Sequence, residues 1–295
     1  MLVTPAFFAA TRAMLAGRVA TTVNSGTVAG VMQFVASLRR ESDGVTISST
    51  PVVITVNAGL PDQVHFTVAP DEYNFPGLDW LGRIDQITVQ VGDKYSNPVK
   101  LNTAVYFNTT GGIINASGFT NNDGQARVDL HSGNPRPSDP TYGPGFGWVY
   151  ASSVGENGVS VKDSILILFS GFSRISNISP STFVVDSASG YSSGPIHFTV
   201  SDQNGNPLSQ GTHIKVTLQY TPPPLTSINL NVTGDVDITL GDTQAKGAGS
   251  TDFTFQVVDQ SSPHLSTRIP VTAIIEVTSR NGIPPNFQVN GTVGG

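Results

Sequence analysis

Short runs of alternating apolar and polar residues recur along the chain, separated by polar stretches rich in Gly, Pro, Asn and Asp. ITVQV (87–91) and IHFTV (196–200) are typical, because every second residue is apolar and a strand of this kind has one buried side. The pattern predicts strands near 63–69, 84–92, 101–108, 124–130, 146–153 and 161–169, then near 182–186, 195–201, 212–220, 227–240, 251–258, 269–278 and 286–293. About seven strands per unit, with turn signals between them, indicate antiparallel β-sandwiches.

One short phrase occurs twice, as DKYSNPV (93–99) and as DQNGNPL (202–208). Each copy follows an alternating run and precedes another. The Pro has a fixed φ and no N–H, so it does not belong in a central strand. We interpret the phrase as a turn that connects two strands of a repeated β domain, and not as a binding site.

Three segments resemble one another as domain endings: 27–59, 142–171 and 268–295. Each contains an apolar strand, a polar turn with Gly, and a second apolar strand. This repetition predicts an incomplete unit at 1–60, with its last strands only, and two full units at 61–172 and 173–295.

Composition supports an all-β chain and excludes several function classes. Charged residues make up only 12% of the sequence, against roughly 25% in an average soluble protein, so the usual helix formers Glu, Lys and Arg are scarce. The net charge is −6 and no basic stripe exists, which argues against nucleic-acid binding. There is no run of 18 apolar residues, hence no predicted membrane span. Cysteine is absent, which excludes disulfides and thiolate metal sites.

The order of residues in the middle unit resembles bacterial Ig-like domains of the invasin and intimin type. The residues that carry the resemblance are Asp93, Asn97, Pro98, Val105, Phe107, Thr120, Gly124, Ala126 and Leu130. The C-terminal unit shows a weaker form of the same resemblance, at Asp202, Asn206, Pro207, Thr243 and Phe253. The resemblance implies tandem Ig-like sandwiches in a stalk or adhesin on a bacterial surface, with no catalytic residues to transfer.

The N-terminal unit departs from this pattern. Thr11 and Gly17 align with Thr120 and Gly124, so residues 1–60 contain only the last strands of such a domain. We do not interpret the N-terminus as a signal peptide, because it lacks a positive first region and Arg12 interrupts its apolar residues. A half sandwich exposes strand edges and one apolar face. Two explanations remain open: the sequence is cut from a longer array, or another copy donates a strand and links subunits head to tail.

Polar motifs give little evidence for chemistry. Residues 190–194 fit G-x-S-x-G, but Pro195 and a strand follow where a nucleophile elbow needs a helix, so we predict a turn. Asp235 and Asp237 fall on one face of the predicted strand 227–240, where we expect solvated carboxylates in preference to a Ca²⁺ site. We therefore expect no enzyme activity, no metal and no cofactor.

Aromatic residues and sequons remain as candidate contacts. Two uses are open for Trp80, Tyr142, Trp148 and Tyr150: a platform on which sugars stack, or core or interdomain packing, which we favour. Trp80 lies in a loop-like stretch and is the best candidate for an exposed ligand contact. Five N-x-S/T sequons are acceptor positions if the chain is exported through a glycosylating pathway: Asn108, Asn115, Asn177, Asn231 and Asn290.

The sequence thus predicts a non-enzymatic, extracellular structural protein on a bacterial surface. The leading hypothesis is a filament or stalk subunit whose partner is another copy of itself, joined head to tail through the incomplete unit. The alternatives are an adhesin or carbohydrate-binding fragment of a longer surface protein, with glycans as partners, and an accessory region of a secreted enzyme.

Overall fold

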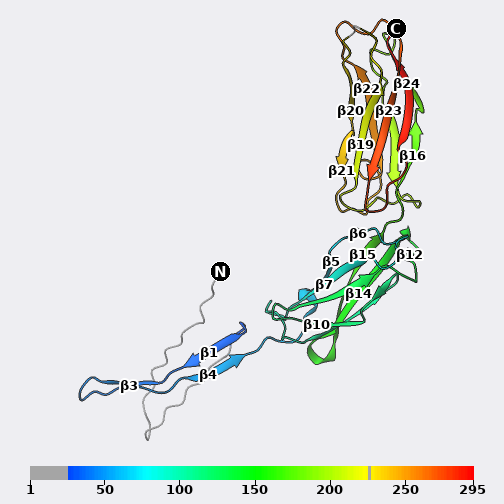
Figure 1. Cartoon of the computed structure of the whole chain (residues 1–295). Coiled ribbons are helices and arrows are strands. Elements are labelled where there is room, and N and C mark those ends of the chain that lie inside the picture. Colours follow the sequence, from blue (N-terminus) through cyan, green and yellow to red (C-terminus); the bar gives the residue numbers. More distant parts are fainter. Residues whose placement is uncertain (1–25, 225–226) are drawn as a thin grey trace.

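The computed structural model describes residues 26–224 and 227–295, and these residues form strands, turns and loops almost throughout. Within these ranges the helical elements are two 3-10 turns, η1 (Gln63–His65) and η2 (Glu156–Gly158). Figure 1 shows three parts that follow one another along an elongated molecule. The predictions for Thr11, Gly17 and the rest of residues 1–25 lie outside the described residues.

The first part is a long two-stranded hairpin. Strand β1 (Gly30–Phe34) pairs antiparallel with β4 (Val52–Val56), and further out β2 (Ser37–Arg39) pairs with β3 (Thr46–Ser48). Its apolar side chains remain open to solvent, as Val31 and Val53 show with 64% and 60% of their surface exposed. No other strand in the described part of the chain pairs with this hairpin.

The middle part is a sandwich of two sheets. The five-stranded sheet has the order β10 (Ser117–Phe119), β8 (Ala104–Thr109), β14 (Phe146–Val154), β15 (Ser160–Phe169), β6 (Asn74–Phe75). The four-stranded sheet has the order β5 (Phe66–Pro70), β7 (Ile84–Val91), β11 (Gln125–His131), β9 (Ile113–Ile114). A short hairpin of β12 (Ser138–Asp139) and β13 (Gly143–Pro144) precedes β14.

The C-terminal part repeats this arrangement. Its four-stranded sheet has the order β16 (Arg174–Ser179), β18 (Ile196–Ser201), β22 (Asp252–Asp259), β20 (Leu230–Gly234). Its five-stranded sheet has the order β17 (Thr182–Val185), β24 (Phe287–Val293), β23 (Ile269–Thr278), β19 (His213–Tyr220), β21 (Asp237–Thr239). In both sandwiches a short early strand, β6 or β17, pairs in parallel with the last strand, while the other pairings are antiparallel.

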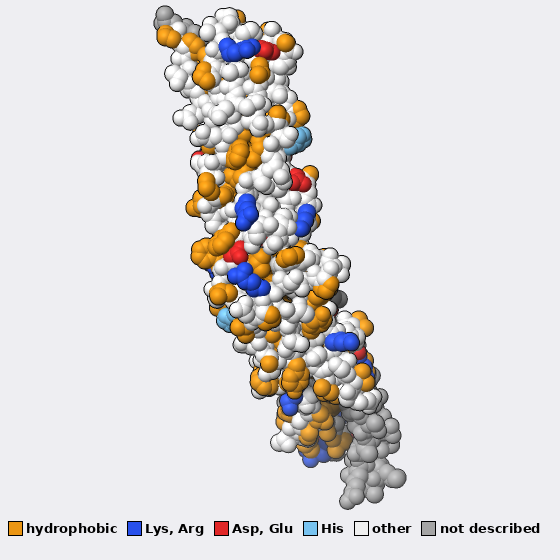
Figure 2. Space-filling view, turned by 90° about the vertical axis from the view of Figure 1, so that its right-hand side faces the viewer, with side chains coloured by type: hydrophobic (Ala, Val, Ile, Leu, Met, Phe, Trp, Pro, Cys, Tyr) orange, Lys and Arg blue, Asp and Glu red, His pale blue; other side chains and the backbone are white. Residues whose placement is uncertain are grey.

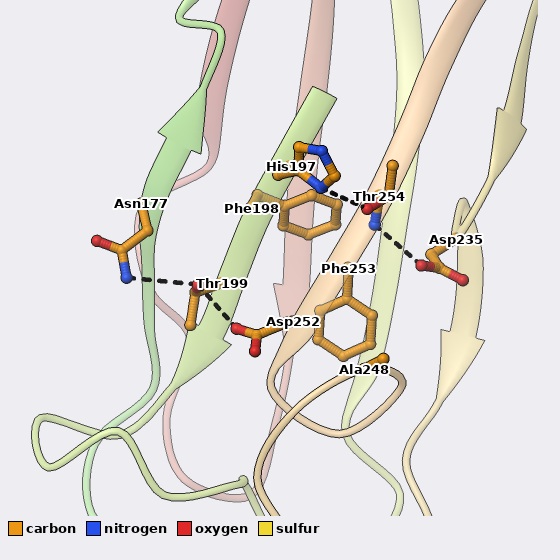
Figure 3. Close-up of a pocket in the computed structure, with 9 residues that line it drawn as sticks. All are labelled: Asn177, His197, Phe198, Thr199, Asp235, Ala248, Asp252, Phe253 and Thr254. Atoms are coloured by element: carbon orange, nitrogen blue, oxygen red, sulfur yellow. Dashed lines mark hydrogen bonds between the residues drawn. The ribbon is translucent and has the colours of Figure 1, made fainter. Parts of the chain in front are cut away.

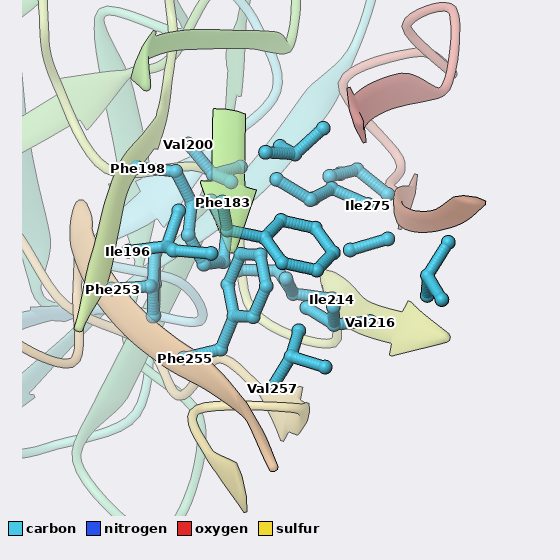
Figure 4. Packing of buried hydrophobic residues seen from close by; sticks show 14 of the residues in the cluster. Phe183, Ile196, Phe198, Val200, Ile214, Val216, Phe253, Phe255, Val257 and Ile275 are labelled. Atoms are coloured by element: carbon cyan, nitrogen blue, oxygen red, sulfur yellow. The ribbon is translucent and has the colours of Figure 1, made fainter. Parts of the chain in front are cut away.

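Alternation along the strands builds both cores. In β7 the odd-numbered residues Ile87, Val89 and Val91 are buried between the sheets. In the C-terminal unit Phe198 and Phe253 are cross-strand partners in one sheet, and they share the core cluster with Phe183 of the other sheet (Figure 4). Since burial of one such side chain contributes about 1.5 to 3 kcal/mol, each of the two clusters stabilises its own sandwich.

The predicted all-β sandwich class is confirmed by this strand pairing, and most predicted strands lie within two residues of the observed ones. The predicted single strand 227–240 is wrong. The chain forms β20 in one sheet, turns at Gly234 with a φ of +103°, and forms β21 in the other sheet. The sequence pattern also missed β16. It missed two-residue strands such as β6 as well, because two residues are too few to show a period.

Candidate functional site: the junctions and the outer sheet faces

The repeated phrase forms a turn in both copies, but it does more than connect two strands. In the first copy the Asp93 carboxylate is buried and accepts hydrogen bonds from the N–H groups of Tyr95 and Asn97, each at 2.9 Å. Its other oxygen accepts the N–H of Gly59, at 2.8 Å, from the segment that follows the hairpin. We call this arrangement the Asp-Asn turn, Asp93–Pro98 in the first copy and Asp202–Pro207 in the second.

The Asn of the first Asp-Asn turn contacts the hairpin directly. The Asn97 side-chain amide donates to the carbonyl of Thr27 at 2.8 Å, and its oxygen accepts the N–H of Ala29 at 3.2 Å. Burial alone would raise the pKa of Asp93, but the hydrogen bonds from Asn97, Gly59 and Tyr95 outweigh burial and hold the pKa below its usual value. The turn therefore holds an ionised carboxylate against the preceding part of the chain.

The second Asp-Asn turn repeats the arrangement. Asp202 accepts the N–H of Asn206 at 2.9 Å within the turn and the N–H of Gly171 at 3.0 Å from the end of the middle unit. The Asn206 amide donates across the junction to the carbonyl of Pro144 at 3.0 Å. The prediction that the phrase forms a turn is confirmed in both copies, and the structure adds that each turn also bonds to the preceding part of the chain.

Two further buried amides cross the second junction. Asn74, from β6, has no exposed surface, and its amide donates to the carbonyls of Pro207, Leu208 and Thr243, each at 3.0 Å. The backbone N–H of Asn74 donates in return to the Asp242 carboxylate at 2.9 Å. These bonds tie the middle unit to two loops of the C-terminal unit.

Asn281 performs the same role from the C-terminal side. It is fully buried, and its amide donates to the Ser170 hydroxyl and the Gly171 carbonyl, both at 2.8 Å. Its oxygen accepts from the N–H and the hydroxyl of Ser209 at 2.9 and 2.8 Å. Because a buried amide without its partners costs about 1 to 3 kcal/mol per group, these bonds fix one relative position of the two units.

Acidic residues gather beside this junction. Burial raises the pKa of Asp85 to about 7. The hydrogen bond from the Glu72 N–H opposes the shift, whereas the carboxylates of Glu72, Asp71 and Asp242 add to it. Arg280 of the C-terminal unit balances part of the charge by an ion pair with Glu72 at 2.6 Å. In the described residues no group of three His, Asp or Glu side chains has an arrangement that could hold a metal ion.

Trp80 lies at this end of the middle unit, with 40% of its surface exposed. Its ring meets Phe172 edge-on at 5.5 Å between centroids, and the Arg83 guanidinium lies 5.4 Å from its centre. Its assignment as a ligand contact remains a prediction. The expectation that Tyr142, Trp148 and Tyr150 pack in a core or between units is wrong, since these side chains lie on the outer face of the five-stranded sheet.

The outer face of the C-terminal four-stranded sheet carries a polar hollow (Figure 3). Asn177, Thr199 and Asp252 form one chain of hydrogen bonds across it, and His197 bonds to Thr254 at 2.8 Å. Phe198 and Phe253 alternate with these residues and face the core. The polar side chains here bond mainly to one another, as expected for the solvent side of a sheet.

The two acidic residues considered for Ca²⁺ do not form a pair. Asp235 follows β20 and accepts the N–H of Thr254 at 2.9 Å, whereas Asp237 lies in β21 and bonds to His213 at 2.7 Å. The His213 hydrogen bond lowers the pKa of Asp237. Because the chain passes from one sheet to the other between them, the idea that they share a strand face is wrong.

The sequons lie on the surface. All five acceptor side chains are exposed: Asn108, Asn115, Asn177, Asn231 and Asn290. Their modification remains a prediction. Gly190–Gly194, the G-x-S-x-G match, is a turn followed by β18 and not by a helix.

Comparison with solved structures finds matches of low sequence identity to bacterial adhesins and to invasin. The Yersinia pseudotuberculosis adhesin InvE matches at 14% identity and a TM-score of 0.31, over 79% of this chain and 60% of InvE. The Escherichia coli adhesin FdeC matches at 15% identity and a TM-score of 0.42, over 90% of this chain and 75% of FdeC. Invasin, described as a bacterial integrin-binding protein, matches at 20% identity and a TM-score of 0.35, over 89% of this chain and 46% of invasin.

The chain carries tandem Ig-like β-sandwiches. The evidence is its own strand order and the antiparallel pairing within each pair of sheets. The chain spans less than two thirds of the InvE structure. No protein-family model and no curated protein sequence matches it. Among the described residues, no helix is long and apolar enough to cross a membrane.

Proposed function

We propose that this chain is a non-enzymatic part of a bacterial cell-surface adhesin, in which rigidly joined Ig-like units hold a binding face away from the cell. The observation that carries the proposal is the second junction. Fully buried Asn74 and Asn281 bond across it from opposite sides, which favours a fixed spacer over a flexible tether. The matched adhesins InvE and FdeC support this reading of the architecture.

The test has two readouts. Beads coated with residues 1–295 are expected to adhere to host epithelial cells or to immobilised matrix, and uncoated beads are not. Small-angle scattering of the free chain is expected to give one extended shape, which Asn281→Ala broadens into an ensemble. Failure to adhere to any cell or matrix surface contradicts the adhesin assignment, and a flexible wild-type chain contradicts the spacer.

A second candidate, a filament subunit, is favoured by the exposed hairpin at residues 30–56. A lone two-stranded hairpin is marginally stable in water, and apolar residues on it, such as Val31 and Val53, are solvent-exposed. Strands from a second copy would complete this unit and build a head-to-tail polymer. Light scattering and electron microscopy of the whole chain, compared with a version that lacks residues 1–60, decide the matter. A monomer in both cases, each with the mass of its own single chain, contradicts the polymer.

A further inference from the structure

An aromatic row lies on the outer face of the middle five-stranded sheet. Trp148 and Tyr150 project from the same side of β14, because the residues between and beyond them, Val149 and Ala151, point into the core. The two ring planes lie within 26° of each other, with centroids 6.4 Å apart. Tyr142 extends the row, 6.5 Å from the Trp148 ring. Tyr142 and Tyr150 are 50% and 43% exposed.

One carboxylate holds two of these residues in place. Asp139 accepts the N–H groups of Thr141 and Tyr142, at 2.8 and 3.0 Å, through one oxygen. Its other oxygen accepts the indole N–H of Trp148 at 3.1 Å. The bonds from the Tyr142 and Thr141 backbone lower the pKa of Asp139, so the carboxylate is ionised at neutral pH. The row is therefore fixed before any ligand arrives, which reduces the entropy cost of binding.

Apart from the Asp139 carboxylate, which is bonded to Trp148, the surroundings of the row carry little charge. Asn108 of β8 lies opposite Tyr150 on one side, and Ser164 of β15 lies opposite it on the other. On the outward side of β8, β14 and β15 the one charged residue is Lys162. Figure 2 views one side of the whole molecule and shows exposed apolar side chains with few charged side chains among them.

We propose that this face, centred on Trp148 and Tyr150, binds a neutral glycan. The biological setting of the inference rests on the proposed adhesive function. A sugar ring has an apolar C–H face that packs against an aromatic ring, and a rim of hydroxyls that pairs with amide and hydroxyl groups. The row offers both, while it offers no cluster of charge to an ionic ligand. Exposed aromatic side chains on a single face also mark interaction surfaces in general.

The site differs from the Trp80 contact predicted from sequence. Trp80 is packed against Phe172 and lies beneath Arg83, in a loop at the junction. Since the chain has two tryptophans, Trp80→Phe leaves Trp148 as the sole indole fluorophore of the whole chain. Its emission then reports on the aromatic row alone.

The test is a fluorescence titration of the Trp80→Phe chain with cellohexaose, chitohexaose, maltohexaose and mannohexaose, with sialyllactose as the anionic probe. At least one neutral hexasaccharide is expected to shift the Trp148 emission to saturation. Tyr150→Ala is expected to weaken that binding about tenfold, which corresponds to about 1.4 kcal/mol. Tyr150→Phe, which keeps the ring, is expected to retain binding. Tyr95→Ala, at an exposed tyrosine outside the row, is the matched control.

The results separate this inference from the adhesin proposal. Absence of binding by all neutral probes at about 10 mM, or equal binding by the Tyr150→Ala chain, overturns the glycan site. Adhesion to cells that survives both Tyr150→Ala and periodate oxidation of the cell surface also overturns it, and points to a protein partner while the adhesin proposal stands. Saturable binding of a neutral hexasaccharide, lost in Tyr150→Ala, by a chain that adheres to no cell supports the site and contradicts the adhesin proposal.

Discussion

The two junctions of the molecule are built around the same Asp-Asn turn, but they join different structures. At the first junction Asp93 and Asn97 bond to the ends of an open hairpin. At the second, Asp202 and Asn206 bond to a complete sandwich, where Asn74 and Asn281 add further buried contacts. The turn thus bonds to the preceding part of the chain at both junctions, whether that part is a hairpin or a complete sandwich. The larger buried contact needs the end surface of a whole unit.

The same contrast exists between the two hairpins that precede the junctions. Both pair in the same antiparallel manner, β1 with β4 and β14 with β15. Ile54 in the first is 46% exposed, whereas Ile167 in the second is completely buried. Pairing of neighbouring strands is therefore encoded locally, and burial depends on strands supplied from elsewhere in the unit.

Truncation of these two isoleucines tests this contrast most strongly. Ile167→Ala is expected to lower the free energy of unfolding of the middle unit by about 2 to 5 kcal/mol, because it leaves a cavity in a filled core. Ile54→Ala, in the hairpin, is expected to change the free energy of unfolding of the chain by less than about 0.5 kcal/mol. Urea unfolding measures both. Equal losses would show that the hairpin is packed in solution, as strand completion by a second copy requires.

The two Asn residues of the Asp-Asn turns provide the next comparison. Asn206 is buried and Asn97 is half-buried, so Asn206→Ala is expected to cost about 1 to 3 kcal/mol, and Asn97→Ala about half as much. Denaturant unfolding gives the energies, and small-angle scattering reports whether the second junction bends. A straight Asn206→Ala chain would mean that Asn74 and Asn281 suffice to hold the units.

The pKa of Asp85, at the second junction, is raised, whereas the pKa of Asp93, at the first, is lowered, so the two junctions predict pH effects of opposite sign. The folded-state pKa of Asp85 is about 7, above its ordinary value of 3.8. The folded protein therefore keeps a proton that the unfolded chain loses, and the stability present below about pH 4 declines as the pH rises through about 7. Asp85→Asn is expected to remove this decline and to stabilise the protein at pH 8 by about 2 kcal/mol.

Thermal unfolding at pH 5 and pH 8 measures the Asp85 effect. Asp123→Asn, at an exposed carboxylate, is the control that removes one negative charge without changing a buried site. If Asp85→Asn and Asp123→Asn shift the melting temperature equally at pH 8, burial of Asp85 is not the cause.

Glycines at corresponding ends of the two hairpins give the finest comparison. A Cβ on Gly171 would lie 2.3 Å from the Gln203 side chain and 2.7 Å from the Asp79 carboxylate. On Gly59 the nearest atom would be the Asp93 Cβ, at 3.2 Å. Gly171→Ala is therefore expected to cost about 1 kcal/mol, and Gly59→Ala a few tenths at most. Differential scanning calorimetry of the two variants resolves the difference, and an equal effect would mean that the second junction relaxes freely.

Much of the fold was predictable because alternation and turn residues act over short distances. Strands such as β7 and β23 follow from their period, and the Ig-like class follows from the strand number and from the Asp-Asn turn. The split of 227–240 was not predictable, since Gly234 and Asp235 interrupt no apolar pattern, and only the pairing partners separate β20 from β21.

The junctions were less accessible from sequence. Asn74 and Asn281 are single Asn residues in an Asn-rich chain, and nothing local distinguishes a buried amide from an exposed one. The repetition of Asp, Asn and Pro in both copies was the available signal, but a turn already explained it. The aromatic row was assigned to packing for a similar reason: Trp148 and Tyr150 predict a shared face, and only the second sheet determines that this face points outward.

The parallel pairing of β6 with β15, and of β17 with β24, has a mechanical consequence. In each unit the strand near the entry of the chain lies beside the strand from which the chain leaves, and both run the same way. A pull on the two ends slides these strands past each other, so their hydrogen bonds are loaded together in shear and not opened one by one. The C-terminal pair spans Thr182–Val185 and the middle pair only Asn74–Phe75, so under tension the middle unit should yield first.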